Sequence, residues 1–115
     1  MTIKREAITG TLAMLVELYP AVFVADKWAE HRPLKVGISH ELEALGILSK
    51  RQLKAALAWY TAHRMYLVAL VAGAARFGLD GLPAGTVTEL DAEHAAERLR
   101  SLDAYRDELA IPGAA

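Results

Sequence analysis

The segment that decides the fold of this chain reads LSKRQLKAALAWYT and spans residues 48–61. Ser49 and Gln52 stand in the capping-box pattern, in which a serine accepts an amide at a helix start and a glutamine three positions on reaches back. Apolar residues then recur at helical spacing, at Leu53, Ala56, Leu57 and Tyr60. The segment therefore predicts an amphipathic helix with one buried face, and we expect Trp59 beside Tyr60 in the core.

Two more helices are predicted on the N-terminal side of this segment. The first runs from about Thr2 to Leu18 and is closed by Pro20, because the residue before a proline disfavours helical angles. The second follows Gly37, with Ser39 as a candidate N-cap, and ends at Gly46, because glycine readily adopts the left-handed conformation that closes a helix.

Two helices are predicted on the C-terminal side. One starts at Thr61, whose hydroxyl suits an N-cap, and continues to about Val71. The last helix of the chain is capped by Thr88 or Asp91, and its apolar stripe begins at Ala95.

A β-hairpin is predicted between these two helices. Asp80-Gly81 lies between short apolar runs, and glycine supplies the positive φ angle that a tight turn needs. Pro83 and Gly85 indicate a longer or bulged turn. The expected fold class is therefore mostly α with a short β-hairpin (α+β), a compact single domain of about five helices.

The composition is that of a globular domain. The chain has 115 residues, 54% of them hydrophobic, and no cysteine, which excludes disulfides, zinc-thiolate sites and cysteine nucleophiles. We assign one domain to residues 1–110 and a frayed tail to residues 111–115. The longest apolar run, Met65–Ala75, has eleven residues, whereas a membrane-spanning helix needs about 20. We therefore expect a cytoplasmic protein with no membrane partner.

Reactive side chains are few and dispersed. The segment Gly37-Ile38-Ser39-His40-Glu41 begins like a nucleophile elbow but lacks the closing glycine. The four histidines do not stand at metal-binding spacing. We therefore expect no enzyme, no cofactor and no metal.

The formal net charge of −1 is unevenly distributed. Residues 27–79 carry eight lysines and arginines against three glutamates, a balance of +5, whereas residues 80–115 carry a balance of −5. Lys50 and Lys54 are four positions apart and share one helix face, with Arg51 on the adjoining face. Cations interleaved with aromatic residues suit a ligand with phosphates and stacking faces. The alternative is that these cations form an ordinary solvated face.

Three stretches of the chain resemble the ProQ/FinO family of bacterial RNA-binding domains. The first is RPLKVGI at residues 32–38. The second is LSKxQLxxALxxYTxxxxYL at residues 48–67. The third joins GAxR at residues 73–76 to LDGxPxG at residues 79–85. Their order and spacing agree with the family, and the similarity covers roughly residues 8–102.

The resemblance implies a protein that binds structured RNA, meaning small RNAs and mRNA 3′ regions. The implied target is the base of a terminator-like hairpin with its single-stranded 3′ tail, and the implied function is post-transcriptional regulation with RNA chaperone activity. A-form stems are read by shape and phosphates, whereas sequence is read mainly in unpaired parts. Neither a cofactor nor an obligate protein partner is implied.

Carried over by position, the resemblance implies RNA contacts at eight residues: Arg32, Lys35, Lys50, Arg51, Lys54, Thr61, Tyr66 and Arg76. Lys35 would contact the RNA backbone, and the helix lysines would lie along the duplex phosphates. Tyr66 and Arg76 would sit in a concave pocket that receives the 3′ end. Thr61, at the head of its helix, would offer unpaired backbone amides to a terminal phosphate or 3′ hydroxyl.

Alternatives remain at several of these positions. Arg76 has Asp80 and Glu89 as possible partners across the hairpin, and Thr61 can serve as a helix cap alone. Ala58 stands where better-known family members carry arginine, so the basic face is thinner here. The alternative function is a small helical protein–protein interaction module without RNA binding, whose affinity would respond far less to salt than RNA binding does.

Overall fold

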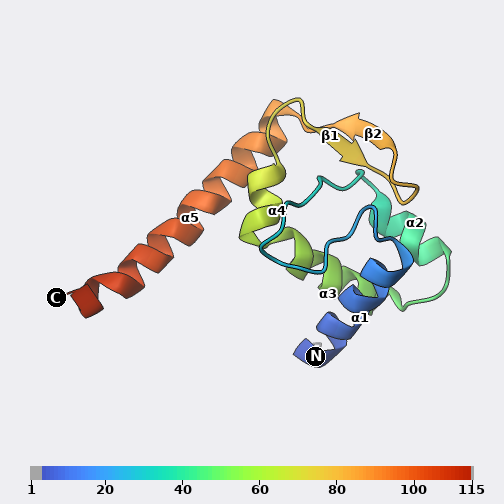
Figure 1. Ribbon diagram of the computed structural model, residues 1–115, viewed down its shortest axis with the longest axis horizontal. Helices are drawn as coiled ribbons and strands as arrows, with labels where there is room; N and C mark the ends of the chain where they lie inside the picture. Colours follow the sequence, from blue (N-terminus) through green and yellow to red (C-terminus); the bar gives the residue numbers. More distant parts are fainter. Residues whose placement is uncertain (1–3, 115) are drawn as a thin grey trace.

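The computed structural model describes the backbone of residues 4–114 and the side chains of residues 4–106. Its elements in chain order are α1 (Arg5–Leu18), α2 (Ile38–Ala44), α3 (Lys50–Thr61), α4 (Arg64–Ala69), β1 (Ala75–Phe77), β2 (Pro83–Thr86) and α5 (Glu89–Ala114). The first four helices and the hairpin gather into one body, from which α5 projects (Figure 1). Five helices and one antiparallel hairpin confirm the predicted fold class.

The core forms around α3, against which α1 and α2 pack. Its buried apolar side chains come from the first four helices and from the segment between α1 and α2: Leu15, Val22, Phe23, Leu34, Ile38, Leu42, Leu53, Leu57, Tyr60 and Tyr66. The Tyr60 hydroxyl accepts a hydrogen bond from the Val24 amide at 3.0 Å, which satisfies its polar end. The predicted buried face of the segment 48–61 is therefore confirmed for Tyr60.

Several local predictions are confirmed. The Ser49 hydroxyl accepts the Gln52 amide at 3.1 Å at the start of α3. The Gln52 side chain reaches back to the Ser49 hydroxyl rather than to its amide. Gly46 follows the end of α2 with φ of 68°, the left-handed conformation expected there. Thr88, one of the two candidates, caps α5 by accepting the Asp91 amide at 3.1 Å.

The hairpin turns where the sequence predicts it. Gly81 has φ of 78°, and the register between Ala75↔Thr86 and Phe77↔Pro83 is irregular, as a bulge requires. A third segment joins the hairpin edge at β1. The Phe77 amide donates to the Pro33 carbonyl, and the Lys35 amide donates to the Phe77 carbonyl, both at 2.9 Å. Residues 33–35 are thereby held alongside β1.

Three sequence predictions about element starts and burial are wrong. The fourth helix begins at Arg64 rather than Thr61, because α3 continues through Thr61 and the chain is extended at His63. The second helix follows Gly37 as predicted, but Gly37 itself, with φ of 88°, is the N-cap of α2 in place of Ser39. The Trp59 side chain is not in the core: it is 37% exposed, because it faces a cavity that also borders α1 and the segment 24–31.

The last helix extends further than predicted. The backbone is helical to Ala114, through most of the segment 111–115 for which we expected a frayed tail, and Ala115 lies outside the described residues. The domain boundary at residue 110 stays a prediction.

Arg64 forms an ion pair with Asp103, which fastens α4 to the middle of α5. Within the part of the chain described, no helix combines the length and apolar character needed to cross a bilayer.

Candidate nucleic-acid interface

A cavity of about 250 Å³ lies between the segment 34–39, the C-terminal half of α3, α4 and β1. It brings together residues that are far apart in the sequence, among them Lys35, Ser39, Ala58, Thr61, Tyr66 and Arg76. Four of the eight predicted RNA-contacting residues therefore meet at one place. The segment 33–35 can take part because its pairing with β1 holds it there.

Tyr66 and Arg76 both bind the main chain of Leu34. The Leu34 amide donates to the Tyr66 hydroxyl at 3.0 Å, and Arg76 Nη1 donates to the Leu34 carbonyl at 2.8 Å. Tyr66 is 4% exposed and Arg76 is 9% exposed. Both side chains line the cavity as part of its wall. Through their hydrogen bonds they hold Leu34 in place, which is the residue directly before Lys35.

The environment of Tyr66 keeps its phenol protonated. Burial raises the pKa of Tyr66 above 10, because the phenolate would lose its hydration. The Leu34 amide and the positive charge of Arg76 favour the phenolate and oppose this shift, but burial is the larger effect. The pKa of Tyr60 is raised in the same direction, again mainly by burial.

The second partner of Arg76 is Asp91 on α5, with Arg76 Nη2 and Asp91 Oδ2 3.0 Å apart. The alternative partners Asp80 and Glu89 are therefore both wrong. The carboxylate that pairs with Arg76 belongs to Asp91, which the sequence suggested only as a helix cap. Arg76 Nε is buried and has no hydrogen-bond partner among the described residues. The guanidinium is therefore anchored through Nη1 and Nη2, whereas its Nε–H has no acceptor among the described residues.

Lys35 lies at the rim of the cavity with its side chain 41% exposed. Its ammonium is 3.1 Å from the Glu41 carboxylate on α2. An ion pair this exposed is weak, typically 0–1 kcal/mol, because water screens both charges. Lys35 can therefore exchange Glu41 for a stronger anion such as phosphate.

Thr61 reaches the cavity in a different way from the one predicted. Its hydroxyl donates to the Leu57 carbonyl at 2.8 Å within α3, so Thr61 ends that helix rather than heading α4. Its amide is consequently not one of the unpaired amides of a helix start. The prediction of an anion site on the amides at Thr61 is therefore wrong, although Thr61 does line the cavity.

Lys50, Arg51 and Lys54 are exposed on α3 and lead toward this cavity. With 3.6 residues per turn, all three fall within roughly 100° of the helix circumference, together with Ala58 and Thr61. We call these five residues the α3 stripe. Its C-terminal end lies in the cavity wall, since Ala58 and Thr61 line the cavity. The cations therefore form a track that opens into the cavity.

Arg32 does not line the cavity. It is exposed, and its guanidinium lies 4.6 Å from the centre of the Phe77 ring of β1, a cation–π arrangement. Among the described residues, no group of three or more histidines, aspartates and glutamates is placed to hold a metal ion.

Sequence reasoning missed three participants in this site. The Leu34 main chain carries no side-chain signal, Asp91 was considered only as a helix cap, and Glu41 was not considered as a partner of Lys35. A sequence indication existed for Glu41, which lies six positions after Lys35, but the turn that brings them together depends on the left-handed Gly37.

Comparison with known proteins agrees with this arrangement. The fold matches the solution structure of a ProQ homolog from Legionella pneumophila with a TM-score of 0.72 and 25% identity, over 88% of this chain and 87% of that one. It also matches the crystal structure of a FinO-like RNA chaperone from Neisseria meningitidis MC58, with a TM-score of 0.63 and 22% identity, over 87% of this chain and 88% of that one. The model of the ProQ/FinO family matches residues 5–110. The chain belongs to the ProQ/FinO family.

Proposed function

We propose that this protein binds structured RNA at the α3 stripe and the cavity at its end. The observation that carries the proposal is the continuity between the two: the cations Lys50, Arg51 and Lys54 lie on the helix face whose last turn lines the cavity. Membership of the ProQ/FinO family and the likeness to a FinO-like RNA chaperone support it.

The two parts of the site suit two parts of an RNA hairpin. Lys50 and Lys54 are about 6 Å apart along the helix axis, and such exposed cations can neutralise successive phosphates of a stem. The cavity is small and partly apolar, so it suits the end of an unpaired strand rather than a duplex. We therefore place the stem along the α3 stripe and the single-stranded 3′ tail at Lys35, Thr61, Tyr66 and Arg76.

The finer expectations belong to the same proposal. The RNA partners are small RNAs and mRNA 3′ regions with terminator-like hairpins, and the protein acts on them in the cytoplasm as a post-transcriptional regulator and RNA chaperone. Binding, rather than catalysis, is the activity that this site supports. Arg32, stacked on Phe77, lies at the edge of the site and contacts the RNA backbone in this arrangement.

The role of the cavity is tested with three hairpin RNAs in a fluorescence anisotropy titration. One RNA ends in a 3′ uridine tail, one lacks the tail, and one carries a 3′ phosphate that blocks the terminal hydroxyl. Deleting the tail is expected to weaken binding at least tenfold, and the 3′ phosphate is expected to weaken it less. Equal affinity for all three RNAs would remove the cavity from the proposal.

The role of the stripe is tested with Lys54→Gln, using Arg98→Gln on α5 as a control that removes the same charge from another exposed position. Removing one phosphate contact is expected to lower the slope of log affinity against log salt by about 0.7–0.9. The control should leave that slope unchanged. RNA binding that is absent at low salt for the unmodified protein would favour the protein–protein interaction module instead.

A further inference from the structure

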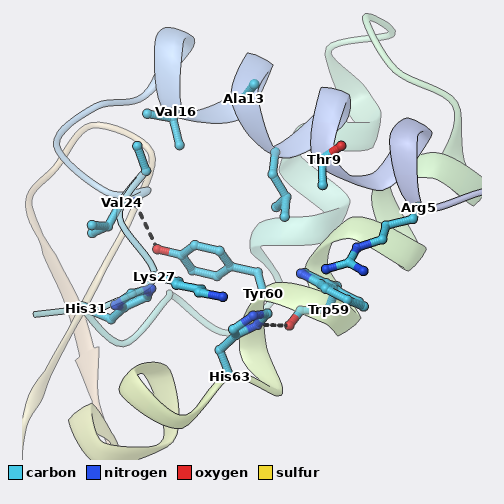
Figure 2. Close-up of a pocket in the computed structure, with 12 residues that line it drawn as sticks. Arg5, Thr9, Ala13, Val16, Val24, Lys27, His31, Trp59, Tyr60 and His63 are labelled. Atoms are coloured by element: carbon cyan, nitrogen blue, oxygen red, sulfur yellow. Dashed lines mark hydrogen bonds between the residues drawn. The ribbon is translucent and has the colours of Figure 1, made fainter. Parts of the chain in front are cut away.

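A second, larger cavity of about 470 Å³ lies on another face of the molecule, between α1, the segment 24–31 and the end of α3 (Figure 2). Among the described residues, its lining has none in common with the cavity of the proposed RNA site. On α3 it is lined by Trp59 and Tyr60, and Trp59 lies five positions after Lys54, which is about 140° around the helix. The two cavities therefore face different directions.

Basic side chains enter this cavity from several elements. Arg5 comes from α1, Lys27 and His31 from the following segment, and His63 from the turn after α3, as Figure 2 shows. None of the described residues that line it is an aspartate or a glutamate. Within the described residues, no carboxylate lies within ion-pair distance of Arg5 or Lys27. The cavity is therefore a positive site without internal anions, which favours an anionic ligand.

An aromatic surface is available beside these cations. The Trp59 ring is 37% exposed, and the Arg5 guanidinium lies 5.5 Å from its centre. The apolar wall opposite comes from α1 and includes Leu12 and Val16. A planar group can stack on Trp59, with Arg5 moving aside or covering its outer face, since among the described residues a cation–π contact is all that holds the guanidinium there.

Both histidines leave one ring nitrogen for a ligand. Nδ1 of His31 is 2.7 Å from the Ala29 carbonyl, and Nδ1 of His63 is 2.7 Å from the Trp59 carbonyl. A carbonyl can only accept, so Nδ1 carries the proton in each ring. Nε2 is consequently the atom that can contact a bound group.

We propose that this cavity binds a single nucleotide, with its base against the Trp59 ring and its phosphate at Lys27 and Arg5. The volume lies within the range of about 300–1,000 Å³ that small-molecule sites occupy. A base needs an aromatic face and a phosphate needs cations without competing carboxylates, and the cavity offers both. The nucleotide is either free or part of an unpaired RNA segment. The inference goes beyond the proposed function, because the cavity is separate from the α3 stripe.

The proposal is tested by titrating adenosine 5′-monophosphate into the full chain and following tryptophan fluorescence. The chain has two tryptophans, so the Trp28→Phe variant reports Trp59 alone. We expect saturable quenching by the monophosphate, with adenosine and inorganic phosphate each binding at least tenfold more weakly. A single-stranded penta-adenylate, titrated in parallel, distinguishes the sources. Tighter binding than the monophosphate indicates an RNA segment, and weaker binding indicates a free nucleotide.

The binding position is tested with Lys27→Gln and Arg5→Gln, with Lys4→Gln as the control because Lys4 is exposed and does not line the cavity. Each cavity variant is expected to weaken monophosphate binding about tenfold, whereas the control leaves it unchanged. Unchanged circular dichroism and unchanged affinity for the tailed hairpin RNA show that the fold and the other site are intact.

Two outcomes would overturn the proposal. The first is no saturable quenching, or equal monophosphate affinity in both cavity variants and the parent, while hairpin RNA still binds. The second is self-association in sedimentation experiments that Lys27→Gln abolishes, because the occupant would then be the acidic C-terminal helix of a second copy. Since hairpin binding is measured separately, neither outcome depends on the proposed RNA function.

Discussion

Tyr66 and Arg76 hold opposite groups of the same residue: the Tyr66 hydroxyl accepts the Leu34 amide at 3.0 Å, and Arg76 Nη1 donates to the Leu34 carbonyl at 2.8 Å. Both side chains are buried. The cavity wall is therefore a hydrogen-bonded structure, and Lys35 is positioned by the residue before it. Changes at Tyr66 and Arg76 must consequently affect the stability of the fold as well as the site.

Tyr66→Phe is expected to lower the free energy of unfolding by about 1–3 kcal/mol, because the buried Leu34 amide loses its acceptor. Urea denaturation followed by circular dichroism measures this. Tyr105→Phe is the matched control, since its side chain is 63% exposed. A Tyr66→Phe variant as stable as the parent would show that the hydroxyl is not required for holding Leu34.

Arg76→Lys is expected to cost about 1.5–3 kcal/mol of unfolding free energy, because an ammonium cannot reach both Leu34 and Asp91 in the geometry of the guanidinium fork. The same urea titration measures it. Arg98→Lys, at an exposed position on α5, makes the same exchange as a control. Equal losses in the two variants would contradict the anchoring role of Arg76.

Asp91→Asn is expected to strengthen hairpin RNA binding roughly two- to fivefold, because Arg76 loses a partly exposed anion that competes with RNA phosphate. Anisotropy titration at fixed salt measures the affinity. Glu89→Gln removes an equal charge from the same helix turn without touching Arg76 and should have a smaller effect. Weaker binding in Asp91→Asn alone would mean that the ion pair positions Arg76 for RNA.

Ala58→Arg is expected to tighten hairpin RNA binding roughly three- to tenfold and to steepen the salt slope by about 0.7–0.9, because it adds a cation to the α3 stripe. Ala58 is exposed, so an arginine fits there without disturbing the core. Ala104→Arg, also exposed but on α5, is the control for an increase in net charge. Comparable tightening in both variants would indicate unspecific attraction rather than contact at the stripe.

Stability is expected to fall as the pH rises above 10. Burial raises the pKa values of Tyr60 and Tyr66, so at alkaline pH the unfolded chain releases protons that the native state retains. Their contribution is therefore fully present below pH 10 and is lost as the pH rises toward the native values. Urea titrations between pH 8 and pH 11 measure the loss. Tyr66→Phe should show a shallower alkaline decrease than the parent, and an equal decrease would contradict the assignment.

Local features of the fold were predictable from the sequence because their interactions span a few residues. The Ser49–Gln52 cap, the left-handed Gly46 and the turn at Asp80-Gly81 all depend on residues within four positions of one another. The boundary at Thr61 was mispredicted because a threonine hydroxyl suits a helix start and equally bonds the carbonyl one turn earlier within a helix. The side-chain chemistry alone does not choose between these two.

The candidate site was predictable in composition but not in its contacts. Lys50, Arg51 and Lys54 share a helix face by spacing alone, and the family pattern pointed to Lys35, Thr61, Tyr66 and Arg76, which the cavity does bring together. Their RNA contacts stay a prediction. The exposure of Trp59, which opens the second cavity, depends on which faces of α3 the neighbouring elements leave uncovered.

Amino-acid order alone thus specified the five helices, the caps at Ser49 and Thr88, the hairpin turn and the separation of basic from acidic residues, because propensity, spacing and charge act over short distances along the chain. Packing specified the partners. Leu34 lies 32 residues before Tyr66 and 42 before Arg76, and Asp91 lies 15 after Arg76, so these contacts exist only once α3, α4, β1 and α5 have come together. Buried polar groups then had to find hydrogen bonds with whatever packing placed beside them, and for Arg76 those were a main-chain carbonyl and a carboxylate on another helix.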